Sequence, residues 1–234
     1  MKKIGLVGGL GPASTVEYYL GLVSRCRTEH GSDVYPEIVI DSVNMHAHTD
    51  PLERGDYDRL GQLVLHSLTC LKAAGAEIAA VTANTEHIIW DQIAPFFPLP
   101  VVSILDAVAE EINRRGYRRV LVFGTEFTMN SGIYEAALSR HGITAILPSA
   151  EDIRTIGGLI YPNLENGIVI PSDRMRLIAL AEKYIDTENA DAFLLGCTEL
   201  PLAIKPDDVR VPVLNSTELH LDAIYRSADE EEYA

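Results

Sequence analysis

Two segments of the chain share one pattern, and this pattern limits the possible folds more than any other feature. Residues 76–87 and 190–199 each open on an alanine and an acidic residue and continue as an apolar run. Seven residues after that alanine, the runs end at Ala83 and Cys197, and polar residues follow. Such runs are typical of buried parallel strands. Ligands bind at the carboxyl ends of such strands, so the sequence predicts two related halves facing one site.

Strand patterns alternate with helix patterns along the rest of the chain. We expect strands near residues 3–7, 37–43, 78–82, 101–104, 119–123, 144–147, 192–195 and 211–214, helices between them, and a last helix from residue 216. Residues 56–74, for example, carry apolar residues at helical spacing and stop at Gly75. This alternation predicts an α/β fold with parallel sheets and right-handed crossovers. We expect the segment with His46, His48 and Asp50 to be a loop.

Composition and charge exclude several classes of function. The chain has 234 residues, of which 47% are hydrophobic, and a formal net charge of -15. Nucleic acid binding needs clusters of Lys and Arg, so this charge argues against it. The sequence lacks an apolar run of about 18 residues, and its first residues lack a signal-peptide pattern. We therefore expect no membrane partner and a cytoplasmic location.

The cysteines offer neither a disulfide framework nor a zinc site. Cys26, Cys70 and Cys197 are odd in number, far apart in the sequence and form no CxxC pair. Cys26 and Cys70 lie in helical patterns, and we interpret them as packing residues. Cys197 ends an apolar strand and precedes an expected helix start at residue 198 or 199. Because a helix N-terminus stabilises a thiolate, we expect a lowered pKa at Cys197.

Three motifs together resemble the aspartate/glutamate racemase family: residues 8–12 (Gly-Gly-Leu-Gly-Pro), 83–87 (Ala-Asn-Thr-Glu-His) and 196–199 (Gly-Cys-Thr-Glu). The resemblance implies two pseudo-symmetric α/β lobes with helices on both sheet faces and an active site in the cleft between them. The first lobe would comprise residues 1–103 and 205–228 and the second residues 104–204, followed by an acidic tail at 229–234. It also implies a cofactor-independent enzyme acting on a small amino or carboxylic acid. An amino-acid racemase for aspartate or glutamate is the leading prediction, and we expect a homodimer.

The chain departs from the family pattern at one chemically important place. The family uses two thiols on opposite faces of the α-carbon, and the first of them aligns with Ala83. A methyl group cannot carry a proton, so full racemisation should be impaired. Alanine could replace the cysteine of a two-base racemase by design, or the enzyme could naturally use one base, or catalysis could be lost and binding retained. A one-cysteine decarboxylase or isomerase of the same superfamily, such as arylmalonate decarboxylase, is therefore the alternative function.

The remaining candidate residues would hold the substrate or support the site. With no metal or pyridoxal phosphate, fixed hydrogen-bond donors must stabilise the carbanion. Hydroxyl and amide groups at strand ends are the candidates, together with the glycine loop and the residue beside the thiol: Gly9, Leu10, Asn84, Thr85, Thr125, Thr128, Thr198 and Glu199. The threonines could equally serve as helix N-caps. We expect His87 to steady its loop, and we expect no metal at the site.

Overall fold

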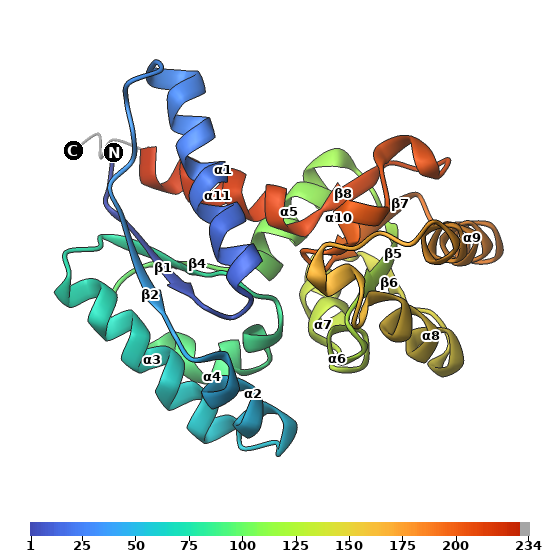
Figure 1. Ribbon diagram of the computed structural model, residues 1–234, viewed down its shortest axis with the longest axis horizontal. Helices are drawn as coiled ribbons and strands as arrows, with labels where there is room; N and C mark the ends of the chain where they lie inside the picture. The colour runs from blue at the N-terminus through green and yellow to red at the C-terminus, as the bar shows by residue number, and fades with distance from the viewer. Residues whose placement is uncertain (230–234) are drawn as a thin grey trace. The chain divides into compact units, whose positions relative to one another are not determined.

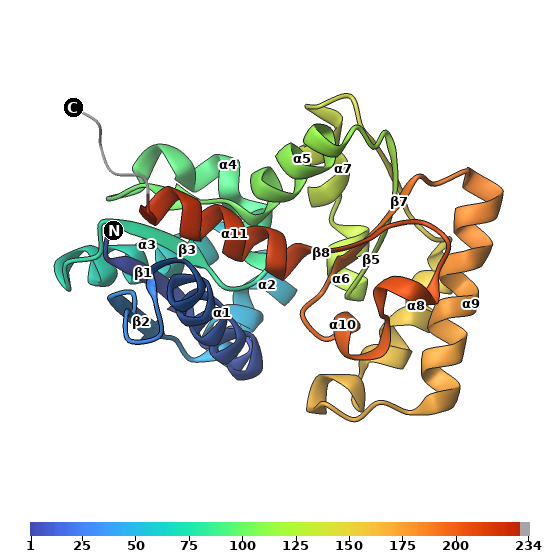
Figure 2. The ribbon, with the colours of Figure 1, turned by 90° about the horizontal axis from the view of Figure 1, so that it is seen from above.

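The computed structural model describes residues 1–229, and most of the predicted acidic tail, Glu230 to Ala234, lies outside the described residues. The described chain divides into two compact units. Unit 1 comprises residues 1–104 and the segment from His220 onward, and unit 2 comprises residues 105–219. Each unit is built on a four-stranded parallel sheet (Figures 1 and 2). The predicted α/β class is confirmed.

Unit 1 holds the sheet β2-β1-β3-β4. Its strands are β1 (Ile4–Gly8), β2 (Ile38–Ser42), β3 (Ile78–Val81) and β4 (Val101–Val102), and its helices are α1 (Pro12–His30), α2 (Met45–Glu53), α3 (Tyr57–Ala73), α4 (Trp90–Ile93) and the 3₁₀ turns η1 (Thr85–Ile89) and η2 (Ala94–Phe96). Local signals explain the main boundaries. Pro12 stands in the first turn of α1 and Gly31 follows the helix, while the Asp56 side chain accepts a hydrogen bond from the Arg59 N–H at the start of α3.

Alternation along the strands divides the apolar residues of unit 1 between two cores. Val7 and Val81 face one side, where α3 and η1 pack. Leu6 and Ala80 face the other, where α1 and the last helix, α11 (Ser216–Asp229), pack. Successive strand side chains point to opposite faces, so a sheet covered on both sides needs an apolar residue at every position. This requirement explains the unbroken apolar runs in the sequence.

Unit 2 repeats this arrangement with the order β6-β5-β7-β8. Its elements are α5 (Ile104–Arg115, beginning at the unit boundary), β5 (Arg119–Gly124), α6 (Glu126–Asn130), α7 (Ile133–Ser139), β6 (Thr144–Ile146), α8 (Ala150–Ile160), η3 (Leu164–Asn166), α9 (Pro171–Glu188), β7 (Ala192–Gly196), α10 (Leu200–Ala203), η4 (Pro206–Asp208) and β8 (Val213–Asn215). Phe123 and Phe193 of the two central strands meet edge to face at 4.8 Å, with α8 and α9 packed on the same core.

Two features differ from the sequence predictions. The strand expected at 211–214 belongs to unit 2, because β8 pairs with β7 as the fourth strand of the second sheet. Of the segment assigned to the first lobe by resemblance, residues 205–219 therefore lie in unit 2. The segment expected to be a loop forms α2, whose first turn is capped by the Asn44 side chain. None of the helices in residues 1–229 is long and apolar enough to cross a membrane.

Candidate active site

The two sheets place the repeated motif at the same topological point. In each order, the first strand of the unit lies between the second and the third, so the direction of the crossovers reverses between β1 and β3 and again between β5 and β7. Ligands of open α/β sheets bind beside the carboxyl ends of such neighbouring strands. Ala83 follows β3 and Cys197 follows β7. Each unit therefore carries one copy of the motif at its own switch point.

In unit 2, a thiol and a carboxylate form a close pair. The Cys197 Sγ donates a hydrogen bond to Glu199 Oε2 at 2.8 Å. Cys197 exposes 5% of its surface, and Glu199 is half-buried. No helix begins directly at the thiol, since α10 starts at Leu200 and has four residues. The pair is therefore a thiol held by an acceptor, rather than a thiolate held by a helix N-terminus.

The surroundings of Cys197 keep its thiol protonated. Burial raises the pKa of Cys197 well above its usual value, and the Glu199 carboxylate adds to this effect. Cys197 also influences two tyrosines of this unit. Burial raises the pKa of Tyr161 to about 12 and also raises the pKa of Tyr134, and Cys197 contributes to both shifts. The predicted lowering of the Cys197 pKa is therefore wrong. The sequence pattern did not show that the thiol would be buried beside an anion.

The threonines predicted in unit 2 lie at adjacent strand ends. Gly124 pairs with Gly196 in the β5–β7 ladder, so Thr125 and Cys197 follow neighbouring residues of the sheet. The Thr125 side chain caps α6 by accepting from the Thr128 N–H at 3.2 Å, and the two threonine hydroxyls lie 2.9 Å apart. Thr128 is buried, whereas Thr125 and Thr198 are half-buried. The structure thus gives Thr125 a capping role and places it, like Cys197, one residue beyond the Gly124–Gly196 pair.

In unit 1, the glycine loop (residues 8–12) is a tight turn that packs against the neighbouring strands. Gly9 has φ of 82°, and its N–H donates to Thr15 Oγ1 at 2.9 Å. A Cβ at Gly9 would clash with the Val43 carbonyl oxygen, so only glycine fits. Leu10 packs into the core of this unit. The hydroxyl of Ser14 donates to the Thr82 carbonyl oxygen at 2.7 Å and ties the loop to the end of β3.

The segment after β3 is held by a neutral histidine. The N–H of Ile104 donates to His87 Nε2 at 3.3 Å, so Nδ1 carries the proton and donates to the Ala83 carbonyl oxygen at 3.0 Å. Burial lowers the pKa of His87 to about 3, with a further contribution from His220. Asn84 is buried, and Ala83 and Thr85 are half-buried. His87 therefore positions the turn, as expected, and has no free nitrogen for proton transfer.

Glu86 is the residue of this segment whose importance the sequence analysis missed. It exposes 5% of its surface, and burial raises the pKa of its carboxyl to about 7. Its Oε2 is buried and has no hydrogen-bond partner within residues 1–229. The sequence does contain a signal for Glu86, because an ionisable residue stands inside a motif that ends a buried strand. Carboxyls with perturbed pKa values cluster at functional sites.

Other candidate residues lie on helices. His48 is buried on α2, and burial lowers its pKa, whereas His46 is exposed at the start of the same helix. Cys70 is exposed on α3, so the expectation that it packs in the interior is wrong, while Cys26 is buried as expected. The reason is helical periodicity: Leu68 and Leu71 face the core and leave Cys70 on the outer face.

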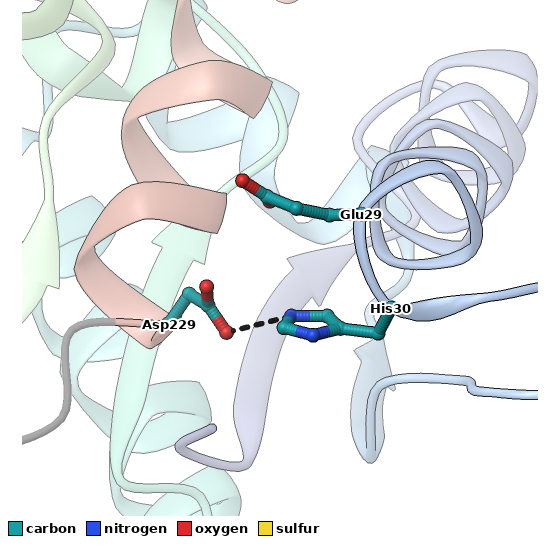
Figure 3. Close-up of side chains that lie close together, drawn as sticks. All are labelled: Glu29, His30 and Asp229. Atoms are coloured by element: carbon teal, nitrogen blue, oxygen red, sulfur yellow. Dashed lines mark hydrogen bonds and ion pairs between the residues drawn. The ribbon is translucent and has the colours of Figure 1, made fainter.

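In the described part of the chain, one group of side chains has ligand atoms close enough to suggest a metal. Glu29 and His30 end α1, and Asp229 ends α11; their ligand atoms lie within 4.8 Å of one another (Figure 3). His30 Nε2 and Asp229 Oδ1 are 3.0 Å apart and form an exposed ion pair. Exposed pairs of this kind need no ion to explain them.

Comparisons with known proteins agree with the fold and show the family of the chain. A family model described as Asp/Glu/hydantoin racemase matches residues 7–224. The chain belongs to this family. A structure of an aspartate racemase homologue from Pyrococcus horikoshii OT3 is 36% identical, with a TM-score of 0.88 and coverage of 98% of this chain and 100% of that one. A putative Asp/Glu racemase from Yersinia pestis is 31% identical, with a TM-score of 0.92 and the same coverage.

A curated relative comes from the same group of enzymes. The broad-specificity amino-acid racemase RacX of Bacillus subtilis (strain 168) is 24% identical over 220 residues, or 92% of each chain. The predicted family is thus confirmed: the chain has the fold of the Asp/Glu racemases and is related to amino-acid racemases along nearly all of its length.

Proposed function

We propose that the protein is a cofactor-independent isomerase of small amino acids in which Cys197 transfers the α-proton. The observation that carries this proposal is the buried Cys197 thiol, which lies at the β5–β7 switch point and donates to Glu199 at 2.8 Å. A thiol at this point can protonate a carbanion. The thiolate that remains after this step is the base that removes the proton in the reverse direction.

Neutral donors are proposed to hold the substrate carboxylate. The candidates are Asn84, Thr85, Thr125, Thr128 and Thr198, and neither copy of the motif contains a lysine or arginine. Hydroxyl, amide and backbone N–H groups can strengthen their hydrogen bonds as the carboxylate gains enolate character, each worth about 2–4 kcal/mol in the transition state. The substrate class rests on the relatives, which are described as an aspartate racemase homologue, a putative Asp/Glu racemase and a broad-specificity amino-acid racemase.

A second candidate function is proton donation to one face of a carbanion, as a one-cysteine decarboxylase or isomerase requires. Two observations favour it. Ala83 supplies no proton at the place that corresponds to Cys197, and the surroundings of Cys197 keep its thiol protonated. A protonated thiol is ready to act as an acid before any substrate binds.

The test is α-proton exchange in deuterium oxide, measured by NMR on both enantiomers of aspartate, glutamate and a panel of neutral and basic amino acids. We expect slow exchange by the parent protein, loss of exchange in Cys197→Ser and normal exchange in the control Cys70→Ser, whose thiol is exposed on α3. Exchange that persists in Cys197→Ser would remove the thiol from the mechanism. If no amino acid exchanges while a substituted malonate loses carbon dioxide, the second candidate replaces the first.

A further inference from the structure

Glu86 is a buried carboxyl that none of the roles described so far uses. It stands in η1, three residues after Ala83, and is 95% buried. Its carboxylate interacts with its own backbone N–H and with the Thr85 hydroxyl. These contacts do not use its second oxygen, since Oε2 is buried and has no hydrogen-bond partner among the described residues.

A structural role explains only one of the two oxygens of the Glu86 carboxylate. A carboxylate near the first N–H groups of a turn is favourable, and that effect explains the paired oxygen. The unpaired oxygen is different, because a buried polar atom without a partner costs about 1–3 kcal/mol, and more when it is charged. Glutamine would keep the cap and avoid the buried charge. The chain instead keeps an ionisable group there.

The position of Glu86 connects it to the departure from the family pattern. The bond from His87 Nδ1 to the Ala83 carbonyl oxygen, 3.0 Å long, folds residues 83–87 into one closed turn at the end of β3. Glu86 belongs to the same turn as the residue that aligns with the missing thiol. His87 is fixed by two hydrogen bonds and Ala83 carries no acid or base, so Glu86 is the ionisable group left in this turn.

We propose that the Glu86 carboxyl is the proton-transfer group with which this chain replaces the thiol missing at Ala83. The proposal rests on the proposed function. In one direction, Glu86 Oε2 takes the α-proton, and the electron pair of the C–H bond remains on the substrate as an enolate. In the reverse direction, the protonated Glu86 carboxyl gives its proton to the α-carbon, so the C–H bond that forms replaces the one that breaks. Between turnovers, Glu86 exchanges its proton with water.

The decisive variant is Glu86→Gln, which keeps the size and one acceptor oxygen but cannot carry a proton. The matched control is Glu110→Gln, which changes an exposed glutamate of α5. Deuterium incorporation is followed separately for the two enantiomers of each amino acid that the parent protein exchanges. We expect Glu86→Gln to lower racemisation at least about 100-fold, the usual size of one acid–base group. KM should change less than threefold, and the control should behave like the parent.

Rescue by a thiol makes the test specific. Adding Ala83→Cys to Glu86→Gln restores a proton carrier to the same turn and should recover racemisation, because only the missing proton transfer was lost. Parent-like racemisation in Glu86→Gln overturns the inference, and so does a loss that Ala83→Cys fails to rescue. A change confined to KM also overturns it, since Glu86 would then bind substrate without moving a proton. If Cys197→Ser still abolishes exchange in these cases, the proposed function stands and the Glu86 inference alone fails.

Discussion

The buried carboxyl of Glu86 should leave a measurable signature in the pH dependence of stability. The pKa of its carboxyl rises from 4.5 to about 7 on folding. The folded protein therefore holds this proton more tightly than the unfolded chain does. Its contribution to the free energy of unfolding is greatest below pH 4.5, falls as the pH rises, and is lost once the pH exceeds about 7. Glu86→Gln removes this dependence and leaves the rest of the molecule in place.

The size of the effect follows from the two pKa values. A shift of one pKa unit corresponds to about 1.4 kcal/mol, and integration between pH 5 and pH 8 gives about 2.5 kcal/mol. Between pH 5 and pH 8, the free energy of unfolding of the parent protein should therefore fall by about 2.5 kcal/mol more than that of Glu86→Gln. With a urea slope of about 2–3 kcal/mol per molar, the difference between the two urea midpoints should change by about 1 M. The buried histidines titrate alike in both proteins, so their contributions cancel.

The assay is urea unfolding at pH 5, 6, 7 and 8, followed by tryptophan fluorescence. Trp90 is the only tryptophan of the chain and stacks on His87 with ring centroids 4.2 Å apart, so it reports on the unit that contains Glu86. Glu110→Gln is again the control and should follow the parent at every pH. If the urea midpoints of Glu86→Gln and the parent stay parallel from pH 5 to pH 8, the Glu86 carboxyl is not buried as described and the reasoning is refuted.

Three further predictions concern the frame around the site. His220→Ala should lower the free energy of unfolding by about 3–5 kcal/mol in urea titrations, because it removes a buried ring together with its hydrogen bonds to the Tyr18 hydroxyl and the Val102 carbonyl oxygen; a loss below 1 kcal/mol would contradict this. Gly9→Ala should cost about 1–3 kcal/mol by the same measurement, because its φ is 82° and its Cβ would meet Val43; unchanged stability would mean that the turn can relax. Ellman's reagent should react quickly with one thiol of the native protein, and Cys70→Ser should remove that fast phase, since the other two cysteines are buried.

The sequence predicted the central strands well and the chemistry around them less well. The apolar runs that end at Ala83 and Cys197 correspond to β3 and β7, because burial on both faces selects for unbroken apolar residues. The order of the strands in the sheets could not be predicted from the sequence. The pattern at 211–214 predicts a strand but carries no information on its neighbour, and the structure pairs it with β7 rather than with the first sheet.

The electrostatic state of Cys197 could not be predicted, because it depends on side-chain distances. The sequence shows that Glu199 is two residues away, but not that its Oε2 lies 2.8 Å from the sulfur and that burial excludes water from the pair. The helix expected to stabilise a thiolate begins later and is only four residues long. The segment around His48 was missed for a simpler reason: Pro51 and several residues with low helix propensity stand in α2, and the Asn44 cap outweighs them.

The interrupted path of the chain has a consequence for synthesis on the ribosome. Unit 2 is one continuous stretch, whereas unit 1 must wait for the residues after Leu219. Leu221 and Ile224 of α11 belong to the core that covers one face of the first sheet, beside Leu6 and Leu22. A nascent chain that ends at residue 219 can complete its second unit while the first still exposes an apolar sheet face, a state prone to aggregation. Premature termination near the end of the message therefore harms the half of the protein that was made first.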